Sequence, residues 1–139
     1  MAVCGDKLVT FLKLKAYTAC LDVKENNKVV TIQPYRSTSV KHLRDAICHG
    51  MGTQSIQQPF SIDAMESFKA LFPSGMLSPT DAVTFQADNK GLLCLSKNSE
   101  TMSCVADKGL ATAFMNMYFN LDHSVMPELT TTWQSCNKS

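Results

Sequence analysis

Residues 82–106 read AVTFQADNKGLLCLSKNSETMSCVA and contain three short runs of β-branched, aromatic and aliphatic residues, at 82–87, 92–97 and 101–106. The residues between these runs, Asp88 to Gly91 and Asn98 to Glu100, have the length and composition of hairpin loops. Strands joined by hairpins are antiparallel. The segment therefore predicts an antiparallel meander.

Two further strand segments precede the meander. Residues 8–23, LVTFLKLKAYTACLDV, alternate in part and predict one long strand or two short ones, and KVVTIQ (28–33) predicts the next strand after the turn KENNK (24–28). In the first segment one face carries Leu12, Leu14, Ala16, Thr18 and Cys20, and the other carries Lys13, Lys15, Tyr17, Ala19 and Leu21. The second face begins charged and becomes apolar at Tyr17.

Apolar residues at helical spacing occur between the strand segments and after them. The spacing predicts one helix from a cap at Ser37, Thr38 or Ser39 to about His49, and a second helix over 61–71. Asp107 is expected to cap a third helix and Pro127 to begin a fourth. The expected buried stripes are Val40, Leu43 and Ile47 in the first helix; Ile62, Met65, Phe68 and Leu71 or Phe72 in the second; Leu110, Phe114, Met117 and Leu121 in the third; and Leu129 and Trp133 in the fourth.

Strands and helices thus come in blocks, which predicts a single α+β domain over residues 1–139 with helices layered on one face of an antiparallel sheet. TQSIQQP (53–59) is expected to be its loosest segment.

Composition excludes several classes of function. With 13 Lys and Arg against 12 Asp and Glu, the net charge of +1 does not suit a nucleic-acid-binding protein. The sequence has no run of about 20 apolar residues and no signal-peptide pattern, so we expect no membrane span and a soluble intracellular protein. Six dispersed cysteines without a CxxC motif are expected to be reduced thiols, most of them buried: Cys4, Cys20, Cys48, Cys94, Cys104 and Cys136.

No motif for a cofactor or a metal is found. Neither GxxxxGK[ST] nor GxGxxG follows a strand, and HExxH and GxSxG are absent, so we expect no cofactor. His42, Asp45 and His49 have a spacing that could in principle hold a metal. They lie near the solvated side of their helix, as does Cys48 beside His49, so we expect neither a metal site nor a Cys–His nucleophile.

Tyr17 is the most suggestive polar aromatic residue, because a buried hydroxyl needs a partner. A ligand carboxylate, the backbone or water could each be that partner. Met102, Met115 and Met117 could line an adaptable apolar pocket or simply fill the core.

Four segments resemble, in order, the chalcone isomerase family: LKAYTACLDV (14–23), VVTIQPYRSTSVKHLRDAI (29–47), ESFKALFPSGMLSPTDAVTFQADNKGLLCLSK (66–97) and VADKGLATAFMNMYFNLDHSVMPELTTTW (105–133). The resemblance implies an open-faced β-sandwich with a ligand cleft between the sheet and the helices. It also implies two functions, catalytic closure of a chalcone to a flavanone or non-catalytic binding of a fatty acid.

The site residues that the resemblance implies favour the second function. The isomerases have a Thr where Tyr17 stands, and a Tyr and an Asn seven residues apart where Ser39 and Ala46 stand. The fatty-acid-binding members have a Tyr at the position of Tyr17, paired with an upstream Arg that holds the lipid carboxylate. No Arg matches here, so Lys7 and Arg36 are the candidate cations.

We therefore expect a monomeric, non-catalytic protein that binds a fatty acid or similar amphiphile through Tyr17, Arg36 and Lys7. The alternatives are a chalcone–flavanone isomerase of flavonoid biosynthesis and a protein-interaction scaffold. Compared with the family, residues 24–28 replace a longer helical insertion and the N-terminal strands are missing, so the chain is expected to be a shortened member. The resemblance also suggests the plastid, although we find no transit peptide.

Overall fold

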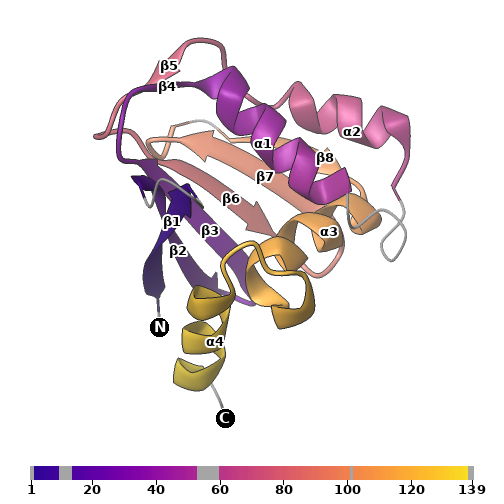
Figure 1. Cartoon of the computed structure of the whole chain (residues 1–139). Coiled ribbons are helices and arrows are strands. Elements are labelled where there is room, and N and C mark those ends of the chain that lie inside the picture. The colour runs from indigo at the N-terminus through magenta and orange to yellow at the C-terminus, as the bar shows by residue number, and fades with distance from the viewer. Residues whose placement is uncertain (1, 10–13, 53–59, 101, 138–139) are drawn as a thin grey trace.

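An antiparallel sheet forms one layer of the protein, in a computed structural model that describes residues 2–9, 14–52, 60–100 and 102–137. Its strand order is β1-β2-β3-β6-β7-β8, and all neighbours are antiparallel (Figure 1). The strands are β1 (Val3–Val9), β2 (Leu14–Lys24), β3 (Asn27–Pro34), β6 (Val83–Ala87), β7 (Leu92–Lys97) and β8 (Ser103–Ala106).

The helices form a second layer on one face of this sheet, as Figure 1 shows. They are α1 (Val40–Gly52), α2 (Ile62–Lys69), α3 (Lys108–Phe119) and α4 (Pro127–Cys136), with a 3-10 turn η1 (Leu121–His123) between α3 and α4. A small ladder of β4 (Thr38–Ser39) and β5 (Met76–Leu77) leads into α1. The predicted α+β class, an open-faced sandwich with helices on one face, is confirmed.

Side-chain caps begin the helices where the sequence predicted. The Ser39 hydroxyl accepts from the backbone N–H of His42, and Asp107 accepts from the N–H of Leu110. Pro127 is the first residue of α4. Each of these groups satisfies or removes an N–H that has no partner within its helix.

Two residues of the predicted buried stripes lie outside the core. Ile62 is 81% exposed because it is the first residue of α2, and the helix buries Ala64 together with the predicted Phe68. Leu121 is 46% exposed because α3 ends at Phe119 and the chain turns into η1. The expectation for residues 53–59 lies outside the described residues.

Alternating residues of the strands fill the core between the two layers. Ala19 and Leu21 are fully buried and Tyr17 packs against the core, so the predicted apolar face of β2 points toward the helices. Opposite them, rings from the helices pack on Phe85 of β6; the ring of Phe114 lies 4.5 Å and that of Phe68 6.4 Å from it. This arrangement holds Tyr17 between the sheet and the helices.

The N-terminal strand corrects one expectation. The predicted first strand began at Leu8, but β1 starts at Val3 and pairs with β2 along Val3–Val9. Residues 8–23 were predicted to form one long strand or two short ones, and they belong to two strands, β1 and β2. The faces predicted for Leu12 and Lys13 lie outside the described residues.

The prediction of reduced, mostly buried thiols is wrong for four of the six cysteines. Cys4 is bonded to Cys20 between β1 and β2, and Cys94 to Cys104 between β7 and β8. Each pair occupies directly opposite positions of an antiparallel ladder, with Cα atoms 4.0 Å apart, which lies slightly below the usual range for a disulfide. Cys48 and Cys136 are free. Disulfides persist in oxidising environments, so cysteine usage does not support the expected intracellular location.

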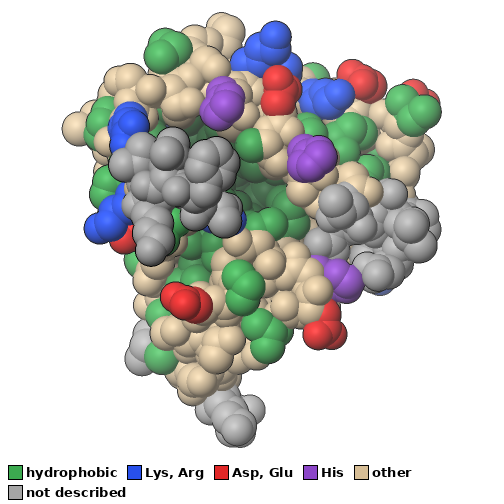
Figure 2. Space-filling view, viewed as in Figure 1, with side chains coloured by type: hydrophobic (Ala, Val, Ile, Leu, Met, Phe, Trp, Pro, Cys, Tyr) green, Lys and Arg blue, Asp and Glu red, His purple; other side chains and the backbone are tan. Residues whose placement is uncertain are grey.

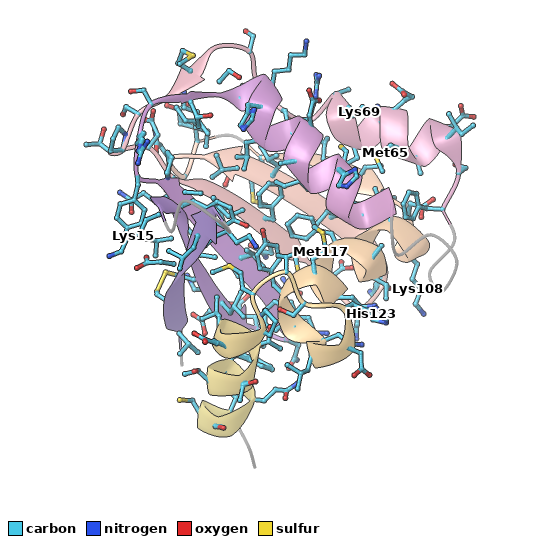
Figure 3. The ribbon with its side chains drawn as sticks, viewed as in Figure 1. Lys15, Met65, Lys69, Lys108, Met117 and His123 are labelled. Atoms are coloured by element: carbon cyan, nitrogen blue, oxygen red, sulfur yellow. A yellow bond between two sulfur atoms is a disulfide. The ribbon has the colours of Figure 1, made fainter. Side chains whose placement is uncertain are left out.

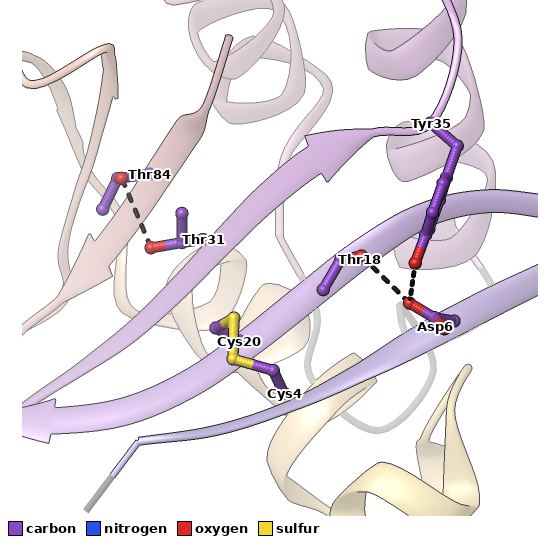
Figure 4. Close-up of a disulfide and its surroundings, with 7 residues drawn as sticks. All are labelled: Cys4, Asp6, Thr18, Cys20, Thr31, Tyr35 and Thr84. Atoms are coloured by element: carbon purple, nitrogen blue, oxygen red, sulfur yellow. Dashed lines mark hydrogen bonds between the residues drawn. A yellow bond between two sulfur atoms is a disulfide. The ribbon is translucent and has the colours of Figure 1, made fainter. Parts of the chain in front are cut away.

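The Cys4–Cys20 disulfide belongs to the polar face of the sheet that the helices do not cover (Figure 4). Beside it, the Asp6 carboxylate accepts from the hydroxyls of Tyr35 at 2.7 Å and Thr18 at 2.9 Å. These hydrogen bonds, with Tyr35 the strongest cause, lower the pKa of Asp6. The network links β1, β2 and the end of β3.

Candidate functional site

A cavity of about 310 Å³ lies between the sheet and α1. Its walls come from the start of β2, the end of β3, the segment that leads into α1, and α1 itself. Figure 2 shows hydrophobic side chains lining a hollow on the face that carries α1. The lining residues are Lys15, Ala16, Tyr17, Ile32, Pro34, Arg36, Ser37, Thr38, His42, Leu43, Ala46 and Leu77. We call this space the large cavity.

A second space of about 70 Å³, the small cavity, adjoins the large one. Both are lined by Tyr17, Leu43 and Ala46, so Tyr17 stands at their junction. The other walls of the small cavity come from α1, α3 and Val125. Met117, which Figure 3 shows between α1 and α3, is one of these walls and is also buried in the core, so both roles proposed for this methionine apply.

The hydroxyl of Tyr17 lies 3.2 Å from the hydroxyl of Tyr118 on α3. Tyr118 is 1% exposed, and its ring packs 5.8 Å from that of Phe114. Burial is the largest cause that raises the pKa of Tyr17, and it raises the pKa of Tyr118 well above the ordinary value. Both phenols are therefore neutral hydrogen-bonding groups at neutral pH.

Two cations of the large cavity differ in their partners. The Lys15 ammonium lies 3.4 Å from the carboxylate of Asp6, and it lies 5.4 Å from the centre of the Tyr35 ring. Lys15 is drawn at the outer edge of the sheet in Figure 3. The guanidinium of Arg36 is exposed and has no ion pair or hydrogen bond within the described part of the chain. Arg36 is therefore the cation of this cavity that remains available to an anion.

Lys7 lies directly opposite Tyr17 in the β1–β2 ladder. Its ammonium donates to the carbonyl oxygen of Val125 at 3.0 Å, and its side chain lines a separate groove between β1 and α4. The structure thus brings Tyr17 and Arg36 to one cavity. Lys7 is not part of its lining, and its ammonium is bound to the backbone oxygen of Val125.

The polar residues on the exposed side of α1 do not form a cluster. His42 and His49 are exposed, and Asp45 pairs with Arg44 at 3.1 Å. The described residues hold no group of three His, Cys, Asp or Glu placed to bind a metal. Burial raises the pKa of Cys48, which disfavours its thiolate.

Two positions that the resemblance linked to isomerase chemistry carry neither the Tyr nor the Asn of the isomerases. The Ser39 hydroxyl is occupied as the cap of α1, since it accepts from the backbone of His42. Ala46 lines both cavities and supplies only a methyl group.

The comparisons with known proteins identify the family. A sequence profile described as chalcone isomerase like matches residues 18–133, which is most of the chain. The chain belongs to the chalcone isomerase-like family. Comparison with curated protein sequences gives no match.

A solved structure supports the fold of this chalcone isomerase-like protein. The crystal structure of a fatty-acid binding protein from Arabidopsis thaliana superposes with a TM-score of 0.74, covering 93% of this chain and 83% of that chain. The two sequences are 11% identical, so the match establishes a shared architecture. None of the helices in the described residues has the length and apolar content needed to cross a membrane.

Tyr118 was not among the site residues predicted from the sequence of this chalcone isomerase-like protein. A signal was present, because Tyr118 follows Phe114 by four residues and so lies on the same predicted stripe of the helix. A hydroxyl on a buried stripe requires a partner, as the hydroxyl of Tyr17 does.

Proposed function

We propose that this chalcone isomerase-like protein binds a fatty acid or a similar amphiphile in the large cavity. The observation that carries the proposal is that Tyr17 and Arg36 line one cavity whose remaining wall is largely apolar. Apolar pockets with a few convergent polar groups are the usual form of small-molecule sites, and about 310 Å³ lies at the lower end of their range.

The two polar residues divide the recognition of the head group. The Tyr17 hydroxyl donates to one carboxylate oxygen, and the Arg36 guanidinium supplies the opposite charge. The aliphatic tail lies against Ile32, Leu43 and Leu77. A carboxylate held by Tyr17 alone would lack a countercharge, which makes Arg36 the necessary second contact.

Two further observations support this assignment over one based on Lys7. Arg36 has no ion pair or hydrogen bond to break within the described residues, whereas Lys7 must first release the carbonyl oxygen of Val125. A guanidinium also suits a carboxylate better than an ammonium does, because it can donate two parallel hydrogen bonds.

Binding is tested by calorimetric titration with saturated fatty acids of increasing chain length, each below its micelle-forming concentration. We expect at least one chain length to bind and to raise Tm by mass action. If no chain length binds, the proposed function is wrong. Mass spectrometry of lipids that co-purify with the protein would then identify any other ligand.

The site is tested with matched arginine variants. Arg36→Gln is expected to weaken fatty-acid binding about tenfold or more, because a charged hydrogen bond is lost. Arg44→Gln is the control, because Arg44 pairs with Asp45 outside the lining of the large cavity. If Lys7→Met weakens binding and Arg36→Gln does not, the countercharge has been assigned to the wrong residue.

A further inference from the structure

Tyr118 is a buried hydroxyl group with one hydrogen-bonding partner in the part of the chain that the structure describes. That partner is the hydroxyl of Tyr17, at 3.2 Å. The side chain is 1% exposed, so it has almost no contact with bulk solvent. Phe114 packs against the Tyr118 ring from the preceding turn of α3.

The direction of this hydrogen bond follows from what surrounds each phenol. If Tyr17 donated its proton to Tyr118, the proton of Tyr118 would have no acceptor, and a buried unsatisfied donor is costly. If Tyr118 donates, its proton is satisfied by the oxygen of Tyr17. The proton of Tyr17 is then free to point into the cavities, which Tyr17 lines and Tyr118 reaches only on the small-cavity side.

We propose that Tyr118 is a positioning residue that holds the Tyr17 hydroxyl as a hydrogen-bond donor toward the large cavity, and thereby selects ligands whose head group accepts a hydrogen bond. This inference rests on the proposed function. Because the oxygen of Tyr17 accepts the proton of Tyr118, the hydroxyl proton of Tyr17 can be donated to the carboxylate. Tyr118 itself does not touch the ligand.

Neighbouring residues fix the positions of Tyr17 and Tyr118. A Cβ at Gly50 of α1 would lie 2.8 Å from the sulfur of Met117, so this glycine lets α1 approach α3 closely beside the small cavity. Tyr118 packs in the core against the ring of Phe114, while Tyr17 is fixed by the β2–β3 ladder opposite Pro34. Packing on both sides is the usual requirement for a precisely oriented polar group.

The test is a double-mutant cycle measured with decanoate as the probe. Tyr17→Phe is expected to weaken decanoate binding about tenfold, the cost of a hydrogen bond to a charged group. Tyr118→Phe is expected to weaken it about threefold or more, because Tyr17 loses the donor that orients it. In the Tyr17→Phe background, Tyr118→Phe is expected to have no further effect.

A merely structural role for Tyr118 predicts a different result. Tyr118→Phe would then weaken binding by the same factor in both backgrounds, and this outcome would overturn the proposal. Tyr35→Phe is the matched control, because the Tyr35 hydroxyl donates to Asp6 on the opposite face of the sheet and is expected to leave decanoate binding unchanged.

A measurement on the unsubstituted protein tests the proposal even if the variants do not fold or the protein does not bind decanoate. In proton NMR of the free protein, the Tyr118 hydroxyl proton is expected to exchange slowly and the Tyr17 hydroxyl proton quickly. The reverse order would show that Tyr17 donates to Tyr118, and the inference would be wrong whether or not decanoate binds. Absence of decanoate binding with the expected exchange order would instead count against the fatty-acid proposal alone.

Discussion

The hydroxyl of Tyr118 lies 3.2 Å from the hydroxyl of Tyr17, and the bond between them joins α3 to β2 across the core. The two residues are 101 positions apart in sequence. Tyr17 can turn its other side to the cavities, but Tyr118 is almost completely buried. This difference in surroundings makes the two hydroxyls unequal in their contributions to stability.

We predict that Tyr17→Phe destabilises the protein by about 1–3 kcal/mol, because it leaves the buried hydroxyl of Tyr118 without a partner. Adding Tyr118→Phe should recover part of that loss, because no unsatisfied group then remains. Chemical denaturation of the single and double variants measures both values. Equal stabilities of Tyr17→Phe and the double variant would show that the Tyr118 hydroxyl finds another partner.

We also predict a loss of stability at alkaline pH that depends on these two tyrosines. Their pKa values are raised in the folded protein, mainly by burial, so the folded state keeps protons that the unfolded state releases near pH 10. The unfolded state then binds fewer protons, and the free energy of unfolding falls as the pH rises above about 10. Below that pH the contribution is fully present.

Denaturation curves at increasing pH check this prediction, with the Tyr17→Phe/Tyr118→Phe double variant as the comparison. The decline should be shallower in the double variant, because both raised pKa values are gone. A double variant that declines as steeply as the unsubstituted protein would assign the effect to other groups.

The strands of the meander could be predicted from sequence because their signals are local. Short runs of β-branched, aromatic and aliphatic residues and the polar loops between them locate β6, β7 and β8 within a few residues, and side-chain caps locate the helices. β1 was missed because Gly5 and Asp6 have low strand propensity. Pairing with β2 and the Cys4–Cys20 disulfide stabilise this strand, and neither is a local property of residues 3–9.

The disulfides and the site depend on pairings that spacing does not reveal. Cys4 faces Cys20 only in the register that the β1–β2 ladder adopts. Tyr17 was singled out as a hydroxyl on an apolar face, but its neighbours Arg36 and Tyr118 come from the segment before α1 and from α3. Tertiary packing brings these three residues together, so sequence periodicity could identify candidate residues but could not show that they share a site.

We predict that reduction of the two disulfides lowers the free energy of unfolding by about 2–4 kcal/mol for each bond, in the chain-entropy estimate. Their sequence separations are 16 for Cys4–Cys20 and 10 for Cys94–Cys104, so the first should contribute slightly more. Denaturation of Cys4→Ala/Cys20→Ala and Cys94→Ala/Cys104→Ala measures each. Titration of six free thiols in the unreduced protein would contradict the bonding.

Cys48→Ser/Cys136→Ser is the control for the disulfide prediction, because both of these cysteines are free. Its Tm should fall on addition of a reducing agent by as much as that of the unsubstituted protein. If the fall in Tm disappears in this variant, the effect of the reducing agent comes from the free thiols and not from the disulfides.

Finally, we predict that Gly91→Ala is more destabilising than Gly75→Ala. Both glycines have positive φ, 98° and 104°, so both alanines cost about 1–2 kcal/mol in backbone strain. A Cβ at Gly91 would also lie 2.7 Å from the Cα of Lys108, whereas one at Gly75 meets nothing within 4 Å. Lys108 is the first residue of α3, and its backbone cannot move away without shifting the helix that carries Tyr118.

The clash should therefore add about 1–3 kcal/mol at Gly91 to the strain that the two positions share. Denaturation of both variants gives the difference directly, and Gly75→Ala serves as the control for strain alone. Because the clash acts on α3, Gly91→Ala should also weaken fatty-acid binding if Tyr118 positions Tyr17, while Gly75→Ala should not. Equal losses of stability at the two glycines would show that the hairpin between β6 and β7 relaxes away from α3.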